Sequence, residues 1–152
     1  GDYRIEQQDG DLLLLQDGDQ ILLVNLDSAE PIVLQRSATH VDWDTESDIL
    51  AFSDGFELAI LNVEADQVDV ITRSSSPITG LAVAADGRYV IASSNTQVIA
   101  FETKAIGLER FNRVLTDSFS RVSDISLAPD TDRLLIGGLA NEIEGLFAKR
   151  LR

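Results

Sequence analysis

A pattern of eleven residues occurs four times along the chain, and no gap is needed to align the copies. Each copy opens with a charged residue, continues with four mostly apolar residues, passes through a short turn and returns as a second apolar segment. The copies begin at Asp11, Asp48, Arg88 and Arg133. Because the order of apolar and turn residues is the same in each, we expect four structural repeats that fold alike and pack on one another.

The turns inside the copies predict β-hairpins. Asp17-Gly18 and Asp54-Gly55 separate the apolar segments of the first two copies, and Ser94-Asn95 and Leu139-Ala140 separate those of the last two. Asp-Gly between apolar segments favours a type I′ turn, because both central residues of that turn need a positive φ. Each copy is therefore expected to contain two antiparallel strands joined by a tight turn.

Further short strands flank each hairpin. Segments rich in Val, Ile and Leu precede all four hairpins, at residues 3–6, 41–43, 81–83 and 125–127. Similar segments follow the first three hairpins, at residues 31–34, 68–71 and 110–115. The unit is therefore four strands in about 40 residues, the size of a β-propeller blade. The fourth copy lacks its last strand.

The two middle strands of each unit are apolar on both faces, which a sheet requires when it packs between two neighbouring sheets. The predicted fold is thus all-β and propeller-like, with about four four-stranded antiparallel blades, the last one incomplete. The expected blade boundaries within this single domain, residues 1–152, are 1–36, 37–73, 74–116 and 117–152.

The third copy resembles the WD-repeat pattern. Residues 84–102, AADGRYVIASSNTQVIAFE, show the Asp-Gly-Arg turn, an apolar strand, a Ser/Asn turn and an apolar strand ending in an aromatic–acid pair. Ala128-Pro129-Asp130 in the fourth copy is a shorter match to the same pattern. The resemblance extends over the whole chain at the level of repeats, and it implies propeller blades.

The number of blades predicts an open arc. Closed propellers have about four to eight blades, and this chain supplies three complete ones and part of a fourth. The chain is expected to be part of a larger ring, completed in a longer protein or by another chain, or else a small four-bladed ring. The end blades of an open arc expose apolar faces, such as that of Leu12 to Leu15, so association is expected. One symmetric solution is a twofold dimer with eight blades.

Composition excludes several classes of partner. With 12 Lys+Arg against 26 Asp+Glu, the net charge is −14, which disfavours nucleic acid and anionic membranes. Cysteine is absent, so the chain has no disulfide, thiolate metal site or cysteine nucleophile. No apolar segment has the length of a transmembrane helix. The sequence begins with Gly1 rather than Met, so we expect a cut or processed chain, and the compartment stays open.

Sequence motifs give no reason to expect catalysis, a metal or a cofactor. His40 is the sole histidine, and the Gly-x-Ser-x-Gly pattern of a serine nucleophile is absent. Alternating acids from Asp42 to Asp48 resemble the spacing of a calcium loop, but Ser47 stands where that loop favours glycine. We interpret this segment as an acidic turn, with calcium binding as the alternative.

The connections between blades share a composition that suggests binding. Residues 35–40, 72–77 and 116–121 each contain hydroxyl side chains and one arginine, and such connections meet on one rim of a propeller. Arginine suits recognition of carboxylates and acidic peptides. The alternative interpretation is that these segments are solvated turns. The candidate binding residues are Arg36, His40, Arg73, Ser75, Phe119 and Arg121.

These observations favour a non-catalytic module for protein–protein interaction, acting as a scaffold with a protein partner or a second copy of itself. One alternative is a structural segment that completes a ring with another chain. The other is a ligand-binding or enzymatic propeller with a site at the mouth of the channel.

Overall fold

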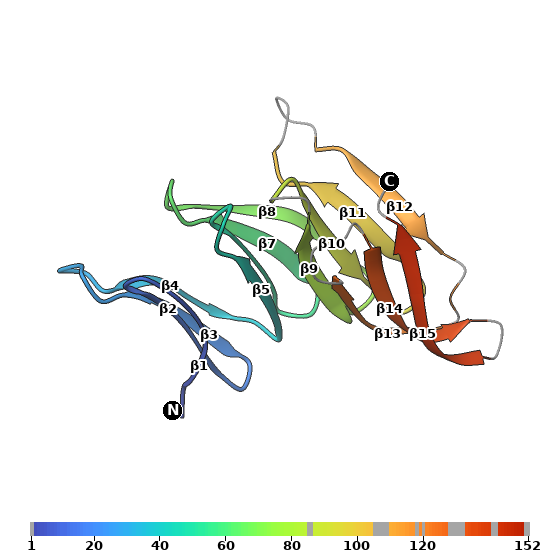
Figure 1. Ribbon diagram of the computed structural model, residues 1–152, viewed down its shortest axis with the longest axis horizontal. Coiled ribbons are helices and arrows are strands. Elements are labelled where there is room, and N and C mark those ends of the chain that lie inside the picture. The colour runs from blue at the N-terminus through green and yellow to red at the C-terminus, as the bar shows by residue number, and fades with distance from the viewer. Residues whose placement is uncertain are drawn as a thin grey trace.

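The computed structural model describes residues 2–84, 87–104, 110–117, 119, 121–127, 133–140 and 143–150. These residues form strands β1 to β15, and none of them is helical. The all-β prediction is therefore confirmed. Figure 1 shows the strands as four successive sheets, from the N-terminal sheet at the left to the C-terminal sheet at the right.

Each sheet is built from strands that follow one another in sequence and pair antiparallel. The first sheet contains β1 (Arg4–Asp9), β2 (Leu12–Asp17), β3 (Gln20–Asn25) and β4 (Ile32–Ser37). The second contains β5 (His40–Asp44), β6 (Ile49–Ser53), β7 (Glu57–Asn62) and β8 (Gln67–Arg73). The third contains β9 (Gly80–Ala84), β10 (Tyr89–Ser93), β11 (Val98–Glu102) and β12 (Asn112–Thr116). The fourth contains β13 (Arg121–Leu127), β14 (Arg133–Ala140) and β15 (Ile143–Arg150).

The fourth sheet has three strands, as its incomplete repeat predicted. Its hairpin differs from the expected one, because β14 continues through Leu139 and Ala140, and Ala140 pairs with Ile143. The expected turn at Leu139-Ala140 is therefore wrong. Residues 141–142, between β14 and β15, lie outside the described residues, as do residues 128–132 before β14.

Apolar side chains fill the space between each pair of neighbouring sheets. In β6, Leu50 and Phe52 belong to the core shared with the first sheet, whereas Ile49 and Ala51 belong to the core shared with the third. A third core joins the third and fourth sheets through residues such as Ile91 and Ile136. Successive side chains of a strand point to opposite faces of the sheet and so enter two different cores. This explains why the middle strands are apolar on both faces.

The first strands of the last three sheets lie side by side, with β9 beside both β5 and β13. Two hydrogen bonds of similar placement join the first strand of one sheet to that of the next. Gln7 Nε2 donates to the Trp43 carbonyl oxygen at 2.8 Å, and the Val83 N–H donates to Asp42 Oδ2 at 2.8 Å. Burial raises the pKa of the Asp42 carboxyl above its usual value, the Val83 N–H partly offsets this, and the charge of Asp44 adds to it.

The turn of the first hairpin is shifted by one position from its prediction. Asp17 pairs with Gln20, so Gly18 and Asp19 form the turn between β2 and β3. Gly18 has φ 58°, and Asp19 is not among the residues with positive φ. A glycine with positive φ at the first central position is typical of a type II′ turn rather than the expected type I′.

Candidate functional site

The connections between sheets lie against the hairpin turns of the preceding sheet, and we call this end of the molecule the connection rim. Ala38 N–H donates to the Asp19 carbonyl oxygen at 2.6 Å, and Ile78 N–H donates to that of Gly55 at 2.6 Å. Val122 N–H makes the third such bond, to the Asn95 carbonyl oxygen at 2.5 Å. The same attachment thus occurs at all three connections and holds them in place.

Sequence reasoning missed the residues that make these attachments. Each is a buried apolar residue followed by a hydroxyl residue, in the pairs Ala38-Thr39, Ile78-Thr79 and Val122-Ser123. The hydroxyl residue reaches forward to the next sheet, since Thr39 N–H and Thr79 N–H donate to Ser53 and Ser93 carbonyl oxygens, each at 2.8 Å. The recurring apolar–hydroxyl dipeptide, which comes directly before β5 and β9 and lies within β13, is the signal that could have located them.

The predicted cations of the connection rim differ in their local contacts. Arg36, on β4, is exposed and donates to the Gln35 carbonyl oxygen. Arg73, at the end of β8, forms an ion pair with Glu57 at 3.0 Å, which offsets its charge. His40 begins β5, and its Nδ1 lies 3.1 Å from Thr39 Oγ1.

Two of the predicted residues share a groove. Arg73 and Ser75 line a space of about 270 Å³ between the second connection and the third sheet, together with apolar side chains such as Ile99 and Phe101. Ser75 is exposed there. The groove combines hydroxyl groups with an apolar wall, a composition suited to contact with a peptide.

In the third connection, Phe119 was expected to be part of the binding surface, but its side chain lies in a core. The Phe119 side chain is only 8% exposed and belongs to the core between the third and fourth sheets, together with Val122 and Ile125. Its ring therefore packs inside rather than forming part of the binding surface. Arg121 is exposed at the start of β13. Residues 118 and 120 of this connection lie outside the described residues.

The opposite end of the strands carries an acidic region between the first two sheets. Asp48 lies in this region beside a groove of about 450 Å³ that Glu64 and Asp66 also line. Partial burial raises the pKa of Asp48, and the negative charges of Asp9, Glu64 and Asp44 raise it further. Among the described residues, no group of three or more possible ligands is arranged to hold a metal ion.

The outer face of the first sheet is apolar and has no sheet packed on it, as Figure 1 shows for β1 to β4 at the left end of the molecule. Two rows of paired residues form this face. One row runs through Ile5, Leu15 and Leu22, and the other runs through Leu13, Val24 and Ile32. Ile5 is 64% and Ile32 57% exposed, and the other four side chains are partly exposed. We call this surface the outer face.

Comparison with known proteins supports the fold through structure alone. No family model matches the sequence, and no curated protein matches it. Hsv2 from Kluyveromyces lactis aligns with a TM-score of 0.63 and 14% identity over 90% of this chain and 47% of its own. A chain of the mitotic checkpoint complex gives a TM-score of 0.68 and 16% identity over 94% of this chain and 46% of its own. A protein from Desulfotomaculum acetoxidans gives a TM-score of 0.71 and 13% identity over 99% of this chain and 52% of its own.

Together with the four radially stacked sheets, these alignments decide the architecture. The chain has a β-propeller fold. It spans about half the length of the structures it matches. Its sheets are therefore propeller blades, and the four of them form an arc, consistent with a partial ring. The part of the chain that the structure describes contains no helix long and apolar enough to cross a membrane.

Proposed function

We propose that the chain is a non-catalytic protein-interaction module, and that its arc of blades is completed into a ring by a second copy of the chain. The observation that carries this proposal is the outer face. Its six apolar residues occupy the same side of the first blade that Leu50 and Phe52 occupy in the second, and those two are buried by the blade before them.

The free energy of burial favours such a contact. Removing apolar surface from water stabilises an interface by about 25 cal/mol per Å², and contiguous exposed apolar surface is typical of association sites. We expect the surface that covers the outer face to be another blade, because each of the three cores inside the chain is formed between two blades. Since the chain aligns with about half of each propeller neighbour, two copies supply the length of one such neighbour.

Sedimentation velocity tests the proposal. The chain is expected to sediment as a dimer at micromolar concentration, and Leu22→Glu is expected to shift it to the monomer, because Leu22 is part of the outer face on a middle strand of the blade. Val70→Glu is the matched control, since Val70 is 48% exposed on β8, away from that face. Far-ultraviolet circular dichroism of both variants checks that the sheets remain folded.

Two results would overturn the proposal. One is a wild-type chain that remains monomeric at concentrations of about 100 μM. The other is a dimer that Leu22→Glu and Val70→Glu weaken to the same extent, because the outer face would then have no special part in association.

The connection rim remains a predicted contact surface for a further protein partner. The exposure of Arg36, Ser75 and Arg121 supports this prediction. The ion pair between Arg73 and Glu57 limits the contribution of Arg73, because an acidic partner would have to compete with the Glu57 carboxylate.

A further inference from the structure

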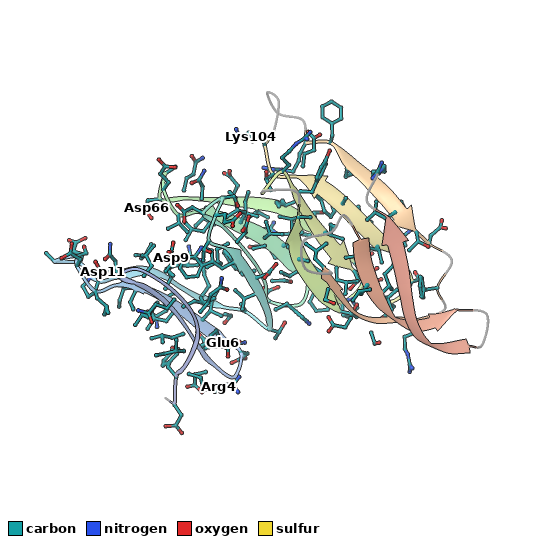
Figure 2. All side chains as sticks on the ribbon, viewed as in Figure 1. Arg4, Glu6, Asp9, Asp11, Asp66 and Lys104 are labelled. Carbon is teal, nitrogen blue, oxygen red and sulfur yellow. The ribbon has the colours of Figure 1, made fainter. Side chains whose placement is uncertain are left out.

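A groove lies between the second and third blades, at the end of the strands opposite the connection rim. Its volume is about 1030 Å³. Turns from both blades border it, including Ser47 between β5 and β6 and Gly87 between β9 and β10. We call it the interblade groove. Figure 2 shows Lys104, which lines the groove, at the turn after β11, and Asp66 at the turn of the second blade.

Three cations of the third blade line the interblade groove: Arg88, Lys104 and Arg110. Such a gathering is unusual in a chain with only 12 Lys+Arg. The ion pairs seen between described residues, Arg4–Glu6 and Arg73–Glu57, include none of these three cations. Their charge is therefore not offset by direct ion pairing within the described part of the chain.

Two of these cations are held in defined positions. Arg110 Nη1 donates to the Glu102 carbonyl oxygen at 2.7 Å and to that of Thr103, which fixes the guanidinium at the end of β11. The guanidinium of Arg88 lies 5.5 Å from the centre of the Tyr89 ring, a cation–π contact. An arginine held through one nitrogen presents its remaining N–H groups as a preformed fork, the geometry that binds a carboxylate through two hydrogen bonds.

The rest of the interblade groove suits a peptide. Ile49 and Ile60, both almost fully buried, give it an apolar floor. The side chains of Asn62 and Gln67 line the wall formed by the second blade, and amides of this kind pair with a peptide backbone. A volume of about 1030 Å³ reaches the upper limit of the pockets that hold small molecules, roughly 300–1,000 Å³, so an extended segment fits it better than a single small anion.

Two carboxylates also line the groove and limit which ligand it takes. Asp69 Oδ1 accepts a hydrogen bond from Gln67 Nε2 at 3.3 Å on the wall of the second blade. Glu102 pairs with Tyr89 across β10 and β11 on the third. The three cations therefore outnumber the two carboxylates, and negative charge is favoured beside the cations but disfavoured beside Asp69 and Glu102. A segment with spaced acidic residues matches this pattern better than a uniformly acidic one.

We propose that the interblade groove binds an acidic segment of a protein partner, in which carboxylates alternate with apolar residues. The carboxylates bind Arg88, Lys104 and Arg110, and the apolar side chains pack on Ile49 and Ile60. This inference rests on the proposed function in one respect, namely that the partner is a protein. Its binding surface is separate from the outer face.

The test uses fluorescence anisotropy with a fluorescein-labelled octapeptide of alternating Glu and Leu, acetylated and amidated, at 150 mM salt. Binding is expected, and replacing every Glu of the peptide by Gln is expected to weaken it at least tenfold. Arg88→Gln combined with Lys104→Gln is expected to weaken binding of the Glu peptide about fivefold to tenfold. Arg110→Gln is expected to have an effect of similar size. Arg4→Gln, at the start of β1 in the first blade, is the matched control and is expected to change nothing.

Three outcomes would overturn the inference: no binding of the Glu peptide up to millimolar concentration, equal binding of the Glu and Gln peptides, or equal effects of the groove variants and the control. Displacement of the peptide by inorganic phosphate at equal concentration would also overturn it, because the groove would then be a small-anion site. The proposed ring is tested separately by sedimentation. A chain that binds the peptide but sediments as a monomer would support the groove proposal and contradict the ring proposal.

Discussion

Asp42 shows how a single side chain joins two blades. It lies on the first strand of the second blade and accepts the Val83 N–H of the third. The bond satisfies a backbone donor, but burial raises the pKa of the carboxyl, so the negative charge is less stable in the fold than in water. Asp42 therefore provides a link between blades at the cost of holding a partly desolvated charge.

Replacing this carboxylate by a neutral amide gives a prediction with a defined sign. A carboxyl whose pKa is raised by folding binds a proton more tightly in the native state, so it lowers stability as the pH rises through the interval above its usual pKa of 3.8. In the Asp42→Asn variant, the amide oxygen can still accept a hydrogen bond from the Val83 N–H, and the amide group does not titrate. Asp42→Asn is therefore expected to gain stability relative to the wild type as the pH rises from 4 to 7.

Chemical denaturation of both proteins at several pH values measures this difference. Each unit by which folding raises the pKa corresponds to about 1.4 kcal/mol in the difference once the carboxyl is fully ionised. A difference that stays constant with pH, or that falls as the pH rises, would contradict the assignment of the raised pKa to Asp42.

Within single strands, the two consecutive glycines of β14 have different roles. The sequence predicts close packing or a bend at Gly137-Gly138, and the structure places both glycines opposite a β-bulge of β13 between Val122 and Asp124. A Cβ atom at Gly138 would collide with the carbonyl oxygen of Arg121. At Gly137 the nearest atom would be Ser123 Oγ at 3.6 Å, an ordinary contact.

The two glycines therefore provide a matched pair of substitutions. Gly138→Ala is expected to destabilise the chain by about 1–3 kcal/mol, because the backbone of β13 must move away. Gly137→Ala is expected to be neutral or to stabilise the strand by up to about 1 kcal/mol. The midpoint of urea denaturation measures both effects, and equal midpoints for the two variants would contradict the predicted close approach at Gly138.

Across the whole molecule, the blades form a linear stack in which stability depends on neighbours. The second and third blades are covered on both faces, whereas the outer face of the first blade is uncovered. In a repeat structure of this kind, a unit with one neighbour opens more readily than a unit with two.

Hydrogen exchange measured by mass spectrometry tests this gradient. At low protein concentration, backbone amides of β6, β7 and β10 are expected to exchange more slowly than those of β2 and β3. At concentrations at which the chain associates, the exchange of β2 and β3 is expected to slow, because the outer face is then covered. Equal protection in the first and second blades of the monomer would contradict the stack as the source of stability.

The sequence by itself determined the repeat, the strand order within each blade and the two-sided burial of the middle strands. These features depend on the local alternation of apolar residues and on turn residues such as Gly18, whose φ of 58° suits glycine. Even so, the turn at Gly18-Asp19 is shifted by one residue, because strand pairing rather than turn preference fixes the register.

Only the tertiary structure decided which residues from different blades meet. It placed Phe119 in a core rather than on a surface, paired Arg73 with Glu57, and brought Arg88, Lys104 and Arg110 to one groove. It also showed the attachments of the blade connections, such as that of Ile78 to Gly55. Local sequence does not encode these contacts, because they depend on how far each blade is turned relative to the next, and packing of the cores between blades sets that geometry.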